Sequence, residues 1–89
     1  PDRAVLLIFR ATAYRLLEVF DLALADLERA LQLDPWNPEA YLERGMSRRL
    51  TGDDAGARAD WLKVLELDGE GPSGDAARRN LELLDVKVE

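Results

Sequence analysis

The side chains that most often carry out enzymatic chemistry are missing from this sequence. It contains no histidine and no cysteine, which removes the commonest general base, the thiolate nucleophile and the usual zinc ligands. Catalysis or metal binding would therefore have to rest on carboxylates. The conspicuous ones stand where helices start or the chain turns, namely Asp21, Asp34, Asp53, Asp54 and Asp68. We predict no catalytic residue, no metal site and no cofactor.

One glycine-rich stretch has a composition that could hold a phosphate. It reads Gly-Glu-Gly-Pro-Ser-Gly over residues 69–74. A phosphate-binding loop needs a preceding strand and a lysine at its end, and this stretch has neither. We interpret residues 69–74 as a loop between helices.

Composition and charge limit the classes of function further. The chain has 89 residues, of which 47% are hydrophobic and 34% charged, as is typical of one small helical domain. The net charge of −6 argues against nucleic acid as a partner, because phosphates attract a basic surface. No apolar run approaches the roughly 20 residues of a membrane-spanning helix. We expect a soluble bacterial protein without membrane insertion, in the cytoplasm in preference to the periplasm.

A period of 34 residues organises the chain. Shifting the sequence by 34 places residues 4–37 on residues 38–71, and nine of those positions are identical. A period of about 20–50 residues is the signature of stacked repeats. The identical pairs are Arg10/Arg44, Arg15/Arg49, Leu16/Leu50, Ala23/Ala57, Ala25/Ala59, Asp26/Asp60, Leu31/Leu65, Leu33/Leu67 and Asp34/Asp68.

Each copy has the pattern of a helical hairpin. The first copy predicts helices near 3–17 and 22–33, and the second predicts a helix that begins at Pro38 and another that follows Gly52. Gly52 suits the left-handed position that ends a helix. Glu18 occupies the same place in the first copy, where a left-handed residue other than glycine costs on the order of 1 kcal/mol. We expect the first turn to be the softer one.

A further helix is expected after the glycine-rich loop, over about 75–86. Its apolar positions form a stripe at helical spacing, and charged residues occupy the other side. Shifted by 34, this segment does not match the repeat pattern. We interpret it as a capping helix, at about 74–88, that closes the stack with a polar outer face. The stripe consists of Ala77, Leu81, Leu84 and Val88.

The repeated positions resemble the tetratricopeptide repeat family, whose pattern runs W-x2-L-G-x2-Y, then A-x3-F, then P. The resemblance covers about residues 1–71. It implies an all-α fold with a single domain over residues 1–89. This domain consists of two helix-turn-helix repeats, 4–37 and 38–71, followed by the capping helix, and these units stack as a right-handed solenoid. The matching residues are Leu7, Ala11, Tyr14, Ala23, Leu27 and Pro35 in the first copy and Tyr41, Gly45, Ala57 and Trp61 in the second.

An arginine and an aspartate recur at matching distances from each turn. Arg10 and Asp26 each lie eight positions from Glu18, and Arg44 and Asp60 each lie eight positions from Gly52. Residues equally distant from the turn of an antiparallel hairpin lie at the same height along its two helices. We expect each pair to bridge its hairpin, with two separately solvated charges as the alternative.

The family resemblance also implies a binding surface. In this family the first helices of successive repeats line a concave groove that takes segments of other proteins. Its chaperone-binding members hold a C-terminal carboxylate with Lys and Asn, at positions occupied here by Ile8, Thr12 and Leu42, so a clamp of that type is not implied. The lining suits an amphipathic or extended segment with an acidic residue near the arginines, and packing between helices is the alternative for each residue. By position, the groove residues are Ile8, Thr12, Arg15, Leu42, Met46 and Arg49, flanked by Val5, Leu16, Glu39 and Leu50.

The first helix is apolar on every side from residue 5 to residue 9, and such a helix is normally covered all round. An upstream repeat, a partner or a second copy could cover it, and Pro1 stands 34 residues before Pro35, in the closing position of a preceding repeat. We predict a protein–protein interaction module. The alternatives are a homodimer that forms through Leu6 and Phe9, and a non-catalytic interaction domain of a larger enzyme.

Overall fold

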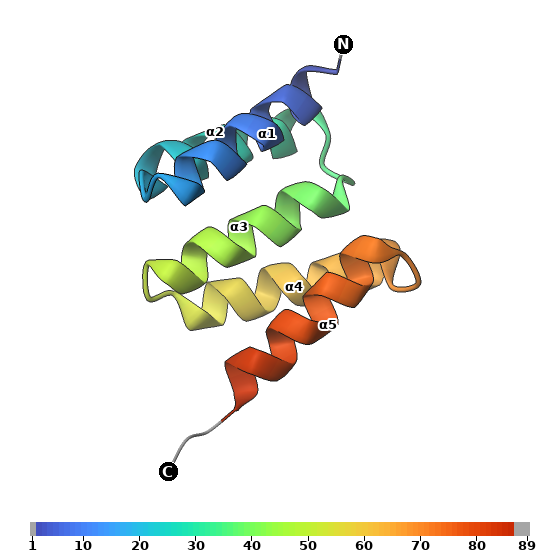
Figure 1. The fold of residues 1–89 in the computed structure, drawn as a ribbon. Coiled ribbons are helices and arrows are strands. Elements are labelled where there is room, and N and C mark those ends of the chain that lie inside the picture. Colours follow the sequence, from blue (N-terminus) through green and yellow to red (C-terminus); the bar gives the residue numbers. More distant parts are fainter. Residues whose placement is uncertain (1, 87–89) are drawn as a thin grey trace.

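The computed structural model describes residues 2–86, which contain five helices and no strand (Figure 1). The chain forms two helical hairpins, followed by a single helix that packs against the second hairpin. The predicted all-α repeat fold is confirmed. None of the helices in the described range has both the length and the apolar character needed to cross a membrane. The helices are α1 (Arg3–Leu16), α2 (Phe20–Leu33), α3 (Pro38–Leu50), α4 (Asp54–Asp68) and α5 (Pro72–Asp85).

Local sequence signals account for most of the helix ends. The side chains of Asp2, Asn37 and Asp53 each accept hydrogen bonds from backbone N–H groups in the first turn of the helix that follows. At the turns, Gly52 has a φ of 92° and Glu18 a φ of 60°. The two turns therefore share a left-handed residue, as predicted, and the first turn carries the strain of a non-glycine residue.

Two predicted boundaries are wrong. Helix α2 begins at Phe20 and not at residue 22, and α5 begins at Pro72 and not at residue 75. Proline suits the first helical position, and Gly74 lies in the first turn of α5, where a Cβ atom would collide with the backbone of residues 68 and 69. Half of the expected loop 69–74 is thus helix, because only residues 69–71 connect α4 to α5. Pro72 stands 34 residues after Pro38, so the start of α5 falls in the repeat register although its sequence does not match the repeat pattern.

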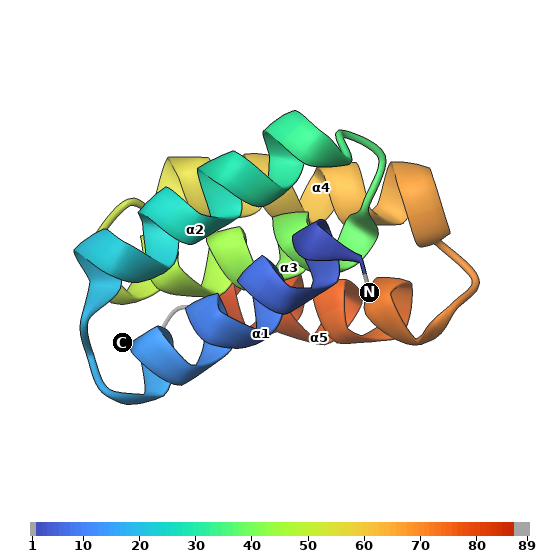
Figure 2. The same ribbon diagram turned by 90° about the horizontal axis from the view of Figure 1, so that it is seen from above.

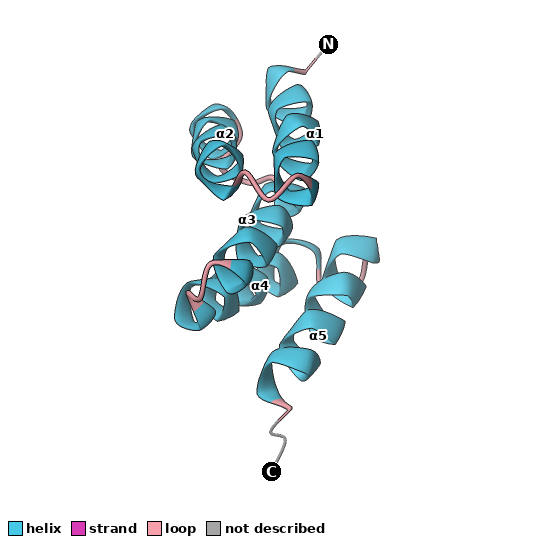
Figure 3. Ribbon diagram, turned by 60° about the vertical axis from the view of Figure 1, so that its left-hand side comes forward, coloured by secondary structure: helices cyan, strands magenta, loops and turns pink. Residues whose placement is uncertain are grey.

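The five helices form two layers. Helices α1, α3 and α5 lie on one side of the molecule, and α2 and α4 lie on the other (Figures 2 and 3). Helix α3 contacts both α1 and α5, so the first helices of the hairpins and the C-terminal helix share one face. The roles suggested above for Pro1 and Val88 concern positions outside the described residues.

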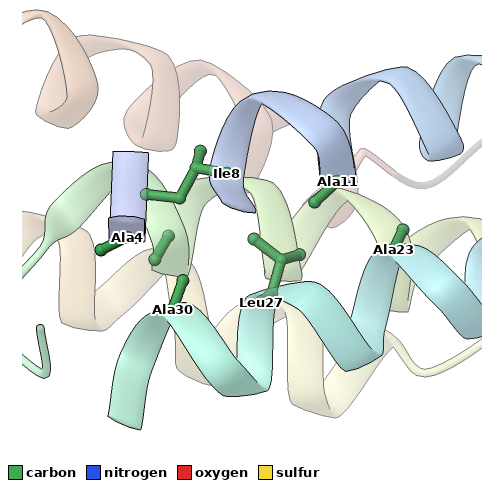
Figure 4. Close-up of a cluster of buried hydrophobic side chains, with 7 residues drawn as sticks. Ala4, Ile8, Ala11, Ala23, Leu27 and Ala30 are labelled. Carbon is green, nitrogen blue, oxygen red and sulfur yellow. The ribbon is translucent and has the colours of Figure 1, made fainter. Parts of the chain in front are cut away.

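The core consists mainly of small side chains in the first hairpin and of a tryptophan in the second. Alanines surround Ile8 and Leu27 in the first cluster (Figure 4). Ala57, Trp61, Val64 and Ala77 form the second cluster, and Leu81 and Leu84 of α5 pack against it. Helix α5 therefore completes the core, and its predicted stripe points inward as far as Leu84. The buried residues of the first cluster are Ala4, Ile8, Ala11, Ala23, Leu27, Ala30 and Ala40.

Candidate functional site

Both predicted arginine–aspartate pairs are brought together. Arg10 donates from Nε and Nη2 to the two carboxylate oxygens of Asp26, each at 2.7 Å. Arg44 makes the same two-point contact with Asp60, at 3.0 and 2.9 Å. The bond with Asp26 raises the pKa of Arg10. Partial burial lowers the pKa of Arg44, but its hydrogen bonds hold the pKa above the usual value. Both side chains are structural bridges inside a hairpin.

The second pair belongs to a larger cluster that the sequence did not suggest. Arg48 donates from Nη1 to Asp60 at 3.0 Å, so this buried aspartate binds two arginines. The Nη1 group of Arg44 donates to Glu28 of α2 at 2.7 Å, which ties the two hairpins together. Arg48 replaces the tyrosine of the family pattern, and that departure was the available signal for its contact with Asp60.

A second ion pair also joins the hairpins. Arg15 of α1 donates from Nε and Nη2 to Glu43 of α3, at 2.9 and 3.2 Å. Only 16% of the Arg15 side chain and 14% of the Glu43 side chain are exposed. We expected Arg15 to face an acidic partner, but its charge is already matched by Glu43. Arg15 therefore forms part of the wall of the groove, and its charge is not free to bind a partner.

Two hollows lie along α3 on the side shared by α1 and α5. The first has a volume of about 240 Å³ and contains Thr12, Leu42 and Ser73 on its walls. The second has a volume of about 220 Å³ and contains Met46, Asn80 and Leu83. Leu42 and Met46 are four residues apart, which is one helical turn or about 6 Å. The two hollows are therefore neighbours along α3, between α1 and α5, and we refer to them together as the groove.

The predicted groove residues divide into three kinds. Leu42, Met46 and Arg49 line the hollows, as expected. Thr12 lines the first hollow, but its hydroxyl donates to the carbonyl of Ile8. Ile8 is only 3% exposed and belongs to the core, so it can offer little surface to a partner. The predicted lining contained no residue of α5, which contributes Pro72, Ser73, Asn80 and Leu83.

Charge is distributed unevenly along the groove. Arg15 and Glu43 neutralise each other, so the charges left to consider are Glu39 on the wall of the first hollow and Arg49 on the wall of the second. Both side chains are exposed, and no ion pair holds either of them among the described residues. One end of the groove is therefore acidic and the other basic, about 15 Å apart for ten residues of helix.

The residues proposed for self-association have different surroundings. Leu6 is 53% exposed and lies beside Leu7 and Arg10 in a hollow outside the groove. Phe9 is 63% exposed and lies on the rim of the first groove hollow. Trp36, at the joint between the hairpins, is also exposed, with the Lys63 amino group 5.7 Å from its ring centre. Within residues 2–86, no group of three acidic side chains is placed to hold a metal ion.

Comparison with known proteins gives a consistent set of relatives. No family model matches the chain. Over all 89 residues the chain is 30% identical to small glutamine-rich tetratricopeptide repeat-containing protein 2 of Saccharomyces cerevisiae, and 34% identical to heat-shock protein cognate (HSC) co-chaperone sgt12 of Aspergillus fumigatus. It covers 25% and 26% of those proteins. Over 68 residues, 76% of the chain, it is 40% identical to RNA polymerase II-associated protein 3 of Xenopus tropicalis, of which it covers 10%.

A solved structure agrees with these relatives. The Arabidopsis OM64 TPR domain superposes on 92% of this chain with a TM-score of 0.80 and 29% sequence identity, and 68% of that domain is covered. About a third of the solved domain therefore lies outside the match. All these proteins are eukaryotic, so the expected bacterial source is not supported.

Proposed function

Because this chain belongs to the tetratricopeptide repeat family, we propose that it is a non-catalytic interaction module that holds a segment of another polypeptide between α1 and α5. The observation that carries this proposal is the groove over Leu42 and Met46, whose two hollows together offer an apolar floor between polar ends. The two repeats and α5 act as a single domain here, because α5 both completes the second core cluster and forms a wall of the groove.

The lining of the groove defines the chemistry of the bound segment. Apolar side chains of the partner would pack on Leu42 and Met46, because burial of apolar surface is the main source of affinity in such a groove. A carboxylate of the partner would meet Arg49, and the Asn80 amide beside it can add a hydrogen bond. A basic group would suit Glu39 at the other end. The segment is therefore amphipathic, with an acidic group at the Arg49 end.

One relative is named a co-chaperone, and this chain covers about a quarter of it. The Lys and Asn that hold a C-terminal carboxylate in chaperone-binding members of the family are absent here, with Ile8, Thr12 and Leu42 at those positions. We therefore propose an internal segment of another protein as the ligand, in preference to a C-terminal carboxylate held by that type of clamp.

Selection from a library of random 12-residue peptides, displayed on phage, tests this proposal. The 89-residue chain is the bait, and the selected peptides are then measured against single variants by fluorescence anisotropy. We expect Met46→Glu to abolish binding, because it places a charge on the apolar floor. We expect Arg49→Glu to weaken the binding of acidic peptides by at least tenfold, because the attraction between Arg49 and their carboxylates becomes repulsion.

Leu62→Glu provides the matched control. Leu62 lies on α4, in the opposite layer, and is about as exposed as Leu50 of the groove, so the same change there should leave binding unaltered. The groove assignment is refuted if the selected peptides bind the Met46→Glu variant as tightly as the unmodified chain. It is also refuted if Leu62→Glu is as harmful as Met46→Glu.

Self-association through Leu6 and Phe9 remains a second candidate, supported by the exposure of both side chains. It predicts a dimer in sedimentation equilibrium that dissociates on Leu6→Glu. A chain that serves instead as an interaction domain of a larger enzyme would use the same groove, and the peptide measurements apply to it equally.

A further inference from the structure

The two hollows of the groove share no lining residue, and an ion pair stands between them. Arg15 of α1 lines the second hollow, and Glu43 of α3 lines the first. Two hydrogen bonds join the side chains, from Nε and Nη2 of the arginine, at 2.9 and 3.2 Å. Glu43 also lies between Leu42 and Met46 along α3, and those two residues line different hollows. The ion pair therefore forms a polar partition between the hollows, on the α1 side of the groove.

The repeat shows that this ion pair is not needed to pack one helix of this layer against the next. Arg15 and Glu43 correspond, 34 residues later, to Arg49 and Ala77. Ala77 of α5 is fully buried in the second core cluster, and no ion pair holds Arg49 among residues 2–86. Helix α5 thus packs against α3 without a pair at this position. The partition is a particular feature of the junction between α1 and α3.

Burial makes the partition a poor surface for an apolar side chain. Arg15 is 16% exposed and Glu43 is 14% exposed, and both border the groove. A bulky apolar side chain laid over them would remove their remaining contact with water, and desolvation of charges without new hydrogen bonds is costly. A peptide group costs less there, because Nη1 of Arg15 donates to no acceptor among the described residues and can donate to a backbone carbonyl.

Each hollow has room for part of a ligand only. The volumes of about 240 and 220 Å³ are below the roughly 300–1,000 Å³ of pockets that take a whole small molecule. Their apolar floors, Leu42 and Met46, are one helical turn apart, or about 6 Å. In an extended segment, side chains two positions apart point to the same side at a spacing of roughly 6.5 Å, and the side chain between them points away.

A bound helix fits the partition less well than an extended segment. Its residues i and i+4 have the required spacing, but the side chain at i+3 shares their face and would lie over the ion pair. An extended segment brings only its backbone to the partition when residues i and i+2 enter the hollows.

We propose that the Arg15–Glu43 pair determines the specificity of the groove, an inference that rests on the proposed function. The pair divides the groove into two subsites, and each subsite accepts one apolar side chain, from positions i and i+2 of an extended segment. The pair excludes segments that present a continuous bulky apolar surface. The side chain at i+1 points away from the groove, so this position tolerates polar residues.

The peptides selected from the 12-residue library test this assignment on the unmodified chain. We expect them to be enriched in pairs of apolar residues separated by one position. Insertion of one alanine between the two anchors should weaken binding by about tenfold or more in fluorescence anisotropy, because one apolar side chain leaves its hollow. Serine at i+1 should change the affinity by less than about threefold, because that side chain points away.

Two double variants show whether the ion pair sets this spacing. Arg15→Met with Glu43→Met removes the charges, and replacement of both partners of a buried pair by apolar residues is often neutral for stability. We expect this variant to keep its helical circular dichroism and to bind the original and the alanine-inserted peptides within about threefold of each other. Arg15→Glu with Glu43→Arg is the matched control, because it reverses the pair but retains a polar partition, and it should keep the preference of the unmodified chain.

Failure of this inference is distinguishable from failure of the proposed function. If the library yields no binding peptide, or only peptides that bind the Met46→Glu variant equally well, the groove assignment fails and the inference fails with it. If the selected peptides require Met46 but show no preferred spacing, or bind as helices with anchors at i and i+4, the groove remains and the partition is refuted. A spacing preference that persists in the Arg15→Met, Glu43→Met variant also overturns the inference, because α3 alone would then set the spacing.

Discussion

Replacement of Gly45 by alanine should destabilise the second hairpin through a single collision. A Cβ atom at this position would lie 2.8 Å from Cδ1 and 2.9 Å from Cε2 of Trp61. Ordinary carbon contacts are about 3.5–4.0 Å. Trp61 is 1% exposed and its indole N–H donates to the Leu42 carbonyl at 3.2 Å, so the ring has neither room nor freedom to move.

The expected magnitude follows from two opposing effects. Overpacking of this kind costs about 1–3 kcal/mol, and loss of the buried indole hydrogen bond adds about 1–3 kcal/mol. Alanine regains about 1 kcal/mol of helix propensity over glycine. We therefore expect Gly45→Ala to lower the free energy of unfolding by about 3 kcal/mol, which is about 12–24 °C in Tm for a domain of this size.

The first hairpin supplies the compensating change. At the positions equivalent to Gly45 and Trp61 it has Ala11 and Leu27, which are both fully buried. Trp61→Leu alone should cost about 2–4 kcal/mol, because it leaves a cavity. In the double variant the new methyl group occupies part of that cavity, so the combined cost should fall short of the sum by about 1–3 kcal/mol.

Urea unfolding followed by far-ultraviolet circular dichroism measures the stability of all four proteins of this double-mutant cycle, namely the unmodified chain, the two single variants and the double variant. The helical signal is used because it does not depend on the tryptophan. Strict additivity of the two substitutions would refute the explanation, because the cost of Gly45→Ala would then come from something other than the indole ring. A stabilised Gly45→Ala variant would show that the ring moves aside freely.

Three further predictions concern polar side chains. Asp60→Ala should cost about 3–5 kcal/mol, because it removes the buried carboxylate that Arg44 and Arg48 share, whereas Asp26→Ala should cost about 1–2 kcal/mol, because Arg10 is exposed and can be solvated. Equal decreases in Tm for the two variants would contradict this difference. Arg15→Ala should lower the free energy of unfolding by about 1–2 kcal/mol and Arg49→Ala by less than about 0.5 kcal/mol, because Arg15 links the two hairpins and Arg49 does not. A lower urea midpoint for Arg49→Ala than for Arg15→Ala would show that Arg15 is not a structural link. The hydroxyl of Ser47 is buried without a hydrogen-bond partner among the described residues, so Ser47→Ala should be neutral or stabilising by up to about 1 kcal/mol; a clear loss of Tm would indicate that the hydroxyl has a partner.

The features that could be predicted from the sequence are those that depend on neighbours along the chain. The 34-residue period, the cap at Asp53 and the left-handed turn residues follow from local geometry. The contact between Arg10 and Asp26 follows as well, because equal distance from a tight turn fixes the height of two residues in an antiparallel hairpin.

The features that only the tertiary structure decided lie between hairpins. The pairing of Arg15 with Glu43, the contact of Arg44 with Glu28 and the position of α5 beside the groove all depend on how one hairpin is rotated against the next. That rotation is set by side chains that pack across the junction, such as Ala40 against the first hairpin, and a repeat period carries no information about it. The sequence by itself thus determined the hairpins and the pairs within them, whereas packing between hairpins decided which charges face the groove.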